Sequence, residues 1–343
     1  MDTLTQITLG ASVGEAVLGK QVGRQAALWG GICGLLPDLD VLLPLGDAVK
    51  NFTYHRSASH SIFVLTLFTP LMVFLILKLR PALARHKRRW VLLVWLALVT
   101  HVLLDCFTVY GTQIFWPLKT PPVMWSTIFI IDPAYTVPLL GGLLAALILT
   151  RHRNRGHLLN TAGLVLSTAY LAWSVGVKLH VTAATHAELQ RQDIAYSRIL
   201  TGPTPFNTVL WRILVMDDGG YYEGFYSLLD KRPQIHFDRY ASRSELLAGI
   251  EDHWPVQRLQ WFTHGFYAVD KRFDSVVMTD LRMGLEPDYV FSFKVGRIGN
   301  PHAKPSPSEK VKADRALDRL AWVWDRIWDP DAPRGAQVGF NRR

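Results

Sequence analysis

The first half of the chain alternates long apolar segments with short polar connections. Four segments lack Lys, Arg, Asp and Glu and, with their flanks, approach the roughly 20 residues that span a bilayer: 61–77, 90–104, 134–150 and 157–177. Two shorter apolar runs, 4–18 and 26–36, predict a helical hairpin before them. A soluble fold would need an improbable amount of polar surface to cover these segments. The pattern therefore predicts an α-helical multi-pass membrane domain over 1–180, with about six hydrophobic helices, some short or re-entrant.

Beyond residue 187 the pattern changes to short alternating apolar stretches among charged residues. These stretches predict antiparallel strands, at 211–216, 224–229, 261–269, 275–281 and 289–295. Ser242-Arg243-Ser244-Glu245 resembles a capping box that opens a short helix reaching about Glu251. The proline-rich residues 301–307 predict a linker before a charged, Trp-bearing helix at about 308–328. We therefore expect a small α+β extramembrane domain over 187–300, followed by a linker and C-terminal helix over 301–343.

Composition supports the membrane class, because 49% of the 343 residues are apolar, the mean hydropathy is positive and the first half is too hydrophobic for an ordinary soluble domain. A formal charge of +9 could indicate nucleic acid, but the densest basic clusters flank apolar segments, at Arg80, Arg85, Lys87, Arg88 and Arg89 and at Arg151, Arg153 and Arg155. Membrane orientation explains these clusters better. The lipid bilayer is therefore the expected partner, and nucleic acid is not.

The basic clusters also predict the topology, because positive residues favour the cytoplasmic side. Segment 61–77 then runs inward and 90–104 outward, and the next two segments repeat this order. Residues 110–133 and everything after about 180 lie outside. We expect residence in a bacterial inner (cytoplasmic) membrane with the C-terminal domain in the periplasm.

Ionisable residues within the membrane portion are few, and most are of kinds that bind metals. An unpaired ionised side chain at the centre of a membrane helix costs about 2.5–3.5 kcal/mol, so their presence needs an explanation. The candidates are Glu15, Asp38, Asp40, His55, His60, His101, Asp105 and Asp132. His101 and Asp105 are spaced i, i+4 and project from one helix face, where a simple His–Asp hydrogen bond is the alternative.

Depth in the membrane brings the candidates together. At 1.5 Å per residue from Trp90, His101 lies near the midplane and Asp105 farther out. Asp132 opens the next helix at the outer boundary, and the second apolar run delivers the Asp38 and Asp40 pair to that side. This agreement predicts a metal site in the outer half of the membrane.

The residue types favour a catalytic site over a closed structural one. Carboxylates mixed with histidines, without clustered cysteines, are typical of zinc sites that keep an open position. The predicted ligands of one or two divalent ions, with zinc preferred, are Asp38, Asp40, His55, His60, His101, Asp105 and Asp132. Arg56 could bind a phosphate, or only a lipid headgroup, and Asp40 or Glu15 could act as general base.

Several short motifs in order resemble one known family. They are Met1–Gln6 with Gly10 and Gly14-Glu15, Leu36–Asp40, His55-Arg56 with Ser59-His60-Ser61, and His101 with Asp105. Together, over about residues 1–175, they resemble the YdjM-like family of bacterial inner-membrane proteins, grouped as metal-dependent hydrolases. The resemblance implies a membrane-bound hydrolase, distantly similar to zinc phospholipase C and P1 nuclease proteins. Many relatives have histidine where this chain has Gln6, whose amide oxygen could still contribute.

The leading hypothesis is a metal-dependent hydrolase that cleaves an ester or phosphoester of a lipid or lipid-linked substrate. A transporter that moves cations or protons over the same residues is the first alternative. The second is a non-catalytic membrane scaffold whose outer domain binds a partner protein. A scaffold predicts no metal and tolerates the loss of His60 or Asp105.

Overall fold

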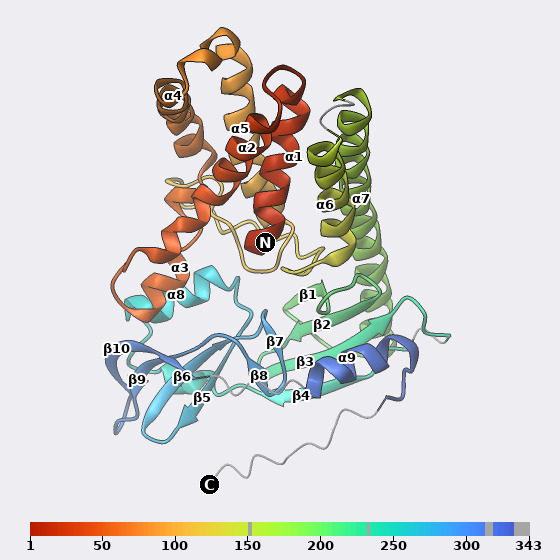
Figure 1. The fold of residues 1–343 in the computed structure, drawn as a ribbon. Helices are drawn as coiled ribbons and strands as arrows, with labels where there is room; N and C mark the ends of the chain where they lie inside the picture. The colour runs from red at the N-terminus through yellow and green to blue at the C-terminus, as the bar shows by residue number, and fades with distance from the viewer. Residues whose placement is uncertain (150–152, 232–233, 313–317, 333–343) are drawn as a thin grey trace. The chain divides into compact units, whose positions relative to one another are not determined.

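The computed structural model describes residues 1–149, 153–231, 234–312 and 318–332. The chain divides into two compact units (Figure 1). The membrane unit comprises Met1–Gly46 and Lys50–Val175, and the sheet unit comprises Asp47–Val49 and Gly176–Arg343. Parts of the sequence predictions, namely residues 150, 151, 313–317 and 333–343, lie outside the described residues.

The membrane unit is built from helices. Its α-helices are α1 (Thr3–Val22), α2 (Arg24–Leu35), α3 (Ala48–Tyr54), α4 (Ile62–Leu79), α5 (Lys87–Cys106), α6 (Pro133–Ile148) and the first part of α7 (Arg153–Arg191). Three 3-10 segments connect them: η1 (Leu36–Leu42), η2 (Ala58–His60) and η3 (Pro81–His86). Three described helical stretches are long and apolar enough to cross a membrane, at Ile62–Leu79, Pro81–Cys106 and Asn154–Arg191. The count of about six hydrophobic helices stays a prediction.

Glycines allow α1 and α2 to pack backbone against backbone. A Cβ atom on Gly10 would collide with the carbonyl of Gly30, and one on Gly14 with the carbonyl of Ala26. A side chain on Gly34 would likewise meet the carbonyl of Gln6. Small residues spaced by four are the usual means of close helix packing in membranes. The glycines therefore bring the ends of the two helices together, where Gln6 and the Gly34 carbonyl lie.

Replacing Gly30 by alanine should therefore destabilise the membrane unit. We expect Gly30→Ala to lower the free energy of unfolding by about 1–3 kcal/mol, because the methyl group overpacks the α1–α2 contact. Gly141→Ala on α6 is the matched control, since its Cβ would meet nothing within 4 Å. Thermal unfolding in detergent measures both, and equal stability of the two variants would refute the role given to close helix packing.

The sheet unit contains two four-stranded antiparallel sheets. The first has the order β1-β2-β3-β4, with bounds Arg198–Pro203, Leu210–Met216, Gly220–Ser227 and Phe237–Ala241. The second has the order β10-β9-β6-β5, with bounds Lys304–Val311, Ser292–Arg297, Ser275–Asp280 and Tyr267–Arg272. A small ladder pairs β7 (Gly284–Leu285) with β8 (Asp288–Tyr289). The helical elements are η5 (Ser244–Leu247), α8 (Trp254–Phe262) and α9 (Asp318–Trp328).

Strand β2 is buried on both faces because helices cover its two sides. Trp211, Ile213 and Val215 share a core with Val177 and other apolar residues of the C-terminal half of α7. Leu210, on the other face, packs in a core with residues of α9. The C-terminal half of α7 is thus part of the sheet unit, and the helix is much longer than the predicted segment 157–177.

Three sequence predictions for this unit are corrected. Residues 261–269 do not form one strand, because α8 runs to Phe262 and β5 begins only at Tyr267. The expected helix after Ser242 is only the four-residue η5. The predicted linker over 301–307 followed by a helix from about 308 is wrong at Lys304–Val311, since these residues pair with β9 as β10 despite their prolines. A bulge in this pairing, between Pro305 and Glu309, accommodates residues that do not fit a regular ladder.

Candidate metal centre

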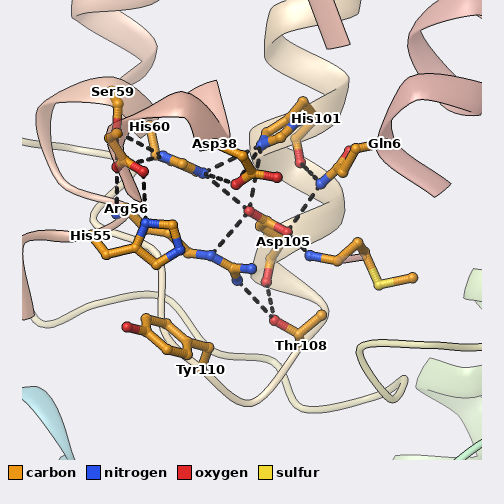
Figure 2. A network of polar contacts seen from close by, with 12 residues as sticks. Gln6, Asp38, His55, Arg56, Ser59, His60, His101, Asp105, Thr108 and Tyr110 are labelled. Atoms are coloured by element: carbon orange, nitrogen blue, oxygen red, sulfur yellow. Dashed lines mark hydrogen bonds and ion pairs between the residues drawn. The ribbon is translucent and has the colours of Figure 1, made fainter. Parts of the chain in front are cut away.

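Three elements of the membrane unit deliver four potential ligands to one place (Figure 2). Helix α5 carries His101 and Asp105 on one face near its end, as their spacing predicts. The 3-10 turn η1, which has Pro37 at its second position, presents Asp38, and η2 presents His60 just before α4 begins. His60, His101 and Asp105 are fully buried, whereas the Asp38 side chain keeps 16% of its surface exposed. Asp38 therefore marks the accessible side of the group.

The four ligand atoms form a compact cluster. His60 Nε2 lies 3.2 Å from Asp105 Oδ2 and 3.4 Å from Asp38 Oδ1. His101 Nε2 lies 3.6 Å from each of these oxygens and 3.3 Å from His60 Nε2. A tetrahedral zinc site with bonds of about 2.0–2.1 Å has edges of roughly 3.3 Å. The spacing therefore matches the corners of one tetrahedral ion site.

The hydrogen bonds around the two imidazoles determine where their lone pairs point. His101 Nδ1 lies 2.7 Å from the carbonyl of Gly34, which can only accept, so Nδ1 carries the proton. His60 Nδ1 lies 2.9 Å from Ser59 Oγ, whose own proton goes to Asp40. Ser59 must then accept from His60 Nδ1. Both Nε2 atoms therefore direct lone pairs into the cluster.

Four acceptors consequently face one another with no hydrogen between them. The two oxygens, Asp38 Oδ1 and Asp105 Oδ2, are buried and accept no hydrogen bond from the described residues. Negative and lone-pair density crowded at such separations is strongly unfavourable away from water, even with Arg56 beside Asp105 Oδ2. A divalent cation at the centre would remove this repulsion. Asp38, His60, His101 and Asp105 thus fit a metal ion, and they are the one such group among the residues the structure describes.

Asp40 and His55 lie one step behind the group. Asp40 accepts hydrogen bonds from His55 Nδ1 at 2.7 Å, Ser59 Oγ at 2.5 Å and the Arg56 backbone N–H at 3.1 Å. Burial opposes the ionisation of Asp40, but its bond to His55 holds the pKa of the carboxyl below its usual range. A carboxylate that acts through Ser59 on His60 is a typical outer-shell arrangement at metal sites. The structure thus places both residues as supports of His60, where the sequence predicted ligands.

Arg56 directs its guanidinium toward the same centre (Figure 2). Its Nε lies 3.3 Å from Asp105 Oδ2, and Nη1 donates to Thr108 Oγ1 at 3.3 Å. The guanidinium carbon lies 4.9 Å from the ring centre of Tyr110. The backbone of Arg56 is left-handed, with φ of 63°, which is uncommon outside glycine. Strain of this kind is often maintained where it aims a functional side chain.

Gln6 and the amino terminus complete the far side of Asp105. Gln6 Nε2 donates to Asp105 Oδ1 at 3.0 Å and to the His101 carbonyl at 3.2 Å, and the amino group of Met1 also contacts Asp105 Oδ1. Gln6 therefore orients a ligand through its amide nitrogen. Its buried amide oxygen accepts no hydrogen bond from the described part of the chain. The sequence motif pointed to Gln6 but did not distinguish these roles.

Two predicted site residues lie elsewhere. Asp132 caps α6: its Oδ1 accepts from Ala134 N and Tyr135 N, and its Oδ2 accepts from Tyr170 at 2.9 Å. Both oxygens are thereby engaged away from the group. Glu15 lies nine positions beyond Gln6 on α1, roughly 13 Å along the axis. There it lines a separate cavity of about 350 Å³.

Ser59 was not among the site residues predicted from the sequence, although it lies inside the motif from His55 to His60. We expect Ser59→Ala to weaken metal affinity about 10–100-fold, because His60 Nδ1 loses its acceptor and its fixed orientation. Ser57→Ala is the matched control, since Ser57 Oγ donates only to the Tyr54 carbonyl among its described contacts. Competition titration against a chelating dye measures both affinities. Equal affinities would show that Ser59 does not orient His60.

Comparison with known proteins identifies a similar sequence and a matching family model. A protein of Bacillus subtilis (strain 168), described as "Uncharacterized protein YfhP", is 32% identical to this chain over 140 residues, which make up 39% of this chain. The match covers 42% of the length of that protein. No solved structure matches the chain. The model of the YdjM inner membrane protein family matches residues 1–181, which include the candidate metal-binding group, namely Asp38, His60, His101 and Asp105. The chain therefore belongs to the YdjM inner membrane protein family.

Proposed function

We propose that this protein is a membrane-embedded, metal-dependent hydrolase that cleaves an ester or phosphoester of a lipid or lipid-linked substrate. The carrying observation is the convergence of four acceptor atoms at tetrahedral spacing beside a buried arginine. Carboxylates and imidazoles together suit an ion that takes part in chemistry rather than one that only stabilises a fold. We propose zinc as the ion. Because the described residues form one such group of ligands, we propose one ion instead of two.

The location of the group supports a substrate in the membrane surface. His60 precedes α4 by two positions, and Asp105 is next to the last residue of α5. Both helices are candidate membrane spans. The group therefore lies at one end of both spans, where lipid headgroups are found. By the orientation of the basic clusters, this end is the outer face of the inner membrane.

The protein's own residues would supply binding and charge neutralisation. Asp38, His60, His101 and Asp105 would hold the ion, with Asp40 and Ser59 fixing the orientation of His60. A bound divalent ion supplies Lewis acidity toward an ester or phosphoryl oxygen and makes water a stronger nucleophile at neutral pH. Arg56 offers a planar fork of donors that suits a phosphoryl group. The side chain of Asp38 is partly exposed, and a substrate can approach the group from this side.

Lipid-product analysis tests this proposal. Purified protein would be incubated with vesicles made from the total lipid of the bacterium that produces it, with and without a chelator. We expect release of a headgroup fragment or fatty acid that the chelator stops and added zinc restores. If the metal-loaded protein leaves the lipids unchanged, as the chelated protein does, the proposal of a hydrolase is contradicted.

A further inference from the structure

An exposed apolar edge lies directly beside the metal-binding group. In and just after η1, the side chains of Val41, Leu42 and Leu43 are 69%, 74% and 60% exposed. Leu39, between Asp38 and Asp40, is also exposed. Large apolar side chains are rarely left so open in a cluster without a partner surface. We call Leu39, Val41, Leu42 and Leu43 the η1 edge.

Other exposed apolar residues of the membrane unit belong to elements that follow η1 or contact its neighbours. η1 contacts η2, after which α4 begins with outward-facing apolar residues such as Phe63 and Leu67. The loop 110–131 adds exposed Phe115, Trp116 and Leu118, and it is tied to the start of α4 by a hydrogen bond from Ser61 Oγ to the Trp116 carbonyl. Tryptophan near a helix end is typical of the membrane interface. Exposed apolar side chains thus occur both at the start of a candidate membrane span and in the turn that carries Asp38.

The short length of η1 explains why it can lie in the interface but cannot cross the bilayer. Seven residues of 3-10 helix cover only about 14 Å. Burying three such side chains among acyl chains is favourable by roughly 1.5–3 kcal/mol for each one, relative to water. The acidic side chains of the same turn, Asp38 and Asp40, point to the polar network instead. η1 is therefore amphipathic, with its acidic side chains directed to the candidate metal-binding group and its apolar side chains exposed.

We propose that the η1 edge inserts into the boundary between headgroups and acyl chains, and that a lipid substrate keeps its chains against this edge while its headgroup reaches Asp38. The substrate part rests on the proposed hydrolase. It commits the substrate class to a membrane lipid that enters sideways from the bilayer. A water-soluble ester would not need the edge.

Fluorescence quenching measures how deep the η1 edge lies in the membrane, and this test does not depend on enzymatic activity. Leu42→Cys protein would be labelled with bimane in vesicles. The wild type, with its buried Cys33 and Cys106, is treated in the same way to measure background labelling. Leu67→Cys on α4 is the positive control. We expect lipids with a nitroxide near the headgroup to quench the label at position 42, and aqueous iodide to quench it weakly. Strong iodide quenching, or protection from both quenchers, would show water or protein at this edge and overturn the proposal.

Substrate preference tests whether a lipid substrate enters along the η1 edge. In Val41→Asn/Leu42→Asn protein, the kcat/KM for a lipid substrate should fall about tenfold or more relative to that for its water-soluble headgroup ester. An unchanged ratio would overturn sideways lipid entry while leaving the hydrolase intact. If neither substrate is cleaved by the wild type, the hydrolase fails, and the quenching result still decides whether the edge lies in lipid.

Discussion

Asp105→Asn protein is expected to bind a divalent metal at least about 100-fold more weakly than the wild type. Replacing even an outer-shell partner commonly costs 10–100-fold in metal affinity, and Asp105 contributes a fully buried oxygen of the ligand group itself. The amide conserves the volume and still accepts from Gln6 Nε2 at the other oxygen position. Elemental analysis of purified protein and zinc titration by calorimetry measure the loss.

Asp132→Asn is the matched control for this experiment. It makes the same substitution at another buried aspartate of the membrane unit, which caps α6 and bonds to Tyr170. We expect this variant to retain wild-type metal affinity, with at most a loss of about 0.5–2 kcal/mol in stability from the weakened cap. Loss of metal in Asp132→Asn alone would contradict the assignment of ligands and favour the wider site expected from the sequence.

Arg56→Lys is expected to lower kcat by about 10²–10³ while leaving the metal content unchanged. The guanidinium lies beside the metal-binding group and can offer two donors to a developing negative charge. Lysine conserves the positive charge near Asp105 but lacks the planar fork. Steady-state kinetics with the lipid substrate and elemental analysis on the same samples separate a catalytic loss from a loss of metal.

Arg24→Lys provides the control for a surface arginine of the same unit. Arg24 is exposed and donates to the Leu147 carbonyl, far from the group along α1 and α2. Its replacement should leave kcat within about twofold of the wild type. If Arg56→Lys turned over as fast as Arg24→Lys, the phosphoryl-binding role of Arg56 would be refuted.

Much of the ligand group could be predicted because helical spacing and membrane depth are encoded locally. His101 and Asp105 share a face by their i, i+4 spacing, and depth places Asp38 and His60 at the same level. Depth does not specify direction around the helix bundle. Asp132 lies at the predicted boundary but belongs to α6, where its oxygens serve the helix cap and Tyr170.

The distinction between ligand and support could not be predicted for Asp40 and His55. Both are two to five residues from a ligand in sequence, and both residue types bind metals. Whether each one joins the four-residue group depends on which way the η1 and η2 turns direct its side chain. That direction follows from tertiary hydrogen bonds, such as the bond from Ser59 to Asp40 across 19 residues.

The sheet unit shows the same division between local and tertiary information. Strands at 211–216 and 275–281 were predicted from apolar runs and are confirmed by β2 and β6. Residues 304–311 carry prolines and charges, so their local pattern indicated a linker, yet pairing with β9 makes them an edge strand. An edge position tolerates proline because one side of the strand needs no partner.

Two imidazoles and two carboxylates are proposed to hold one metal ion in this protein. X-ray absorption spectroscopy at the zinc edge of the purified protein can identify the atoms around that ion. We expect one ion per chain with only nitrogen and oxygen neighbours at about 2.0–2.1 Å and outer scattering from two imidazole rings. A sulfur neighbour at about 2.3 Å, or protein that shows no zinc absorption after it has been incubated with zinc and washed, would contradict this assignment.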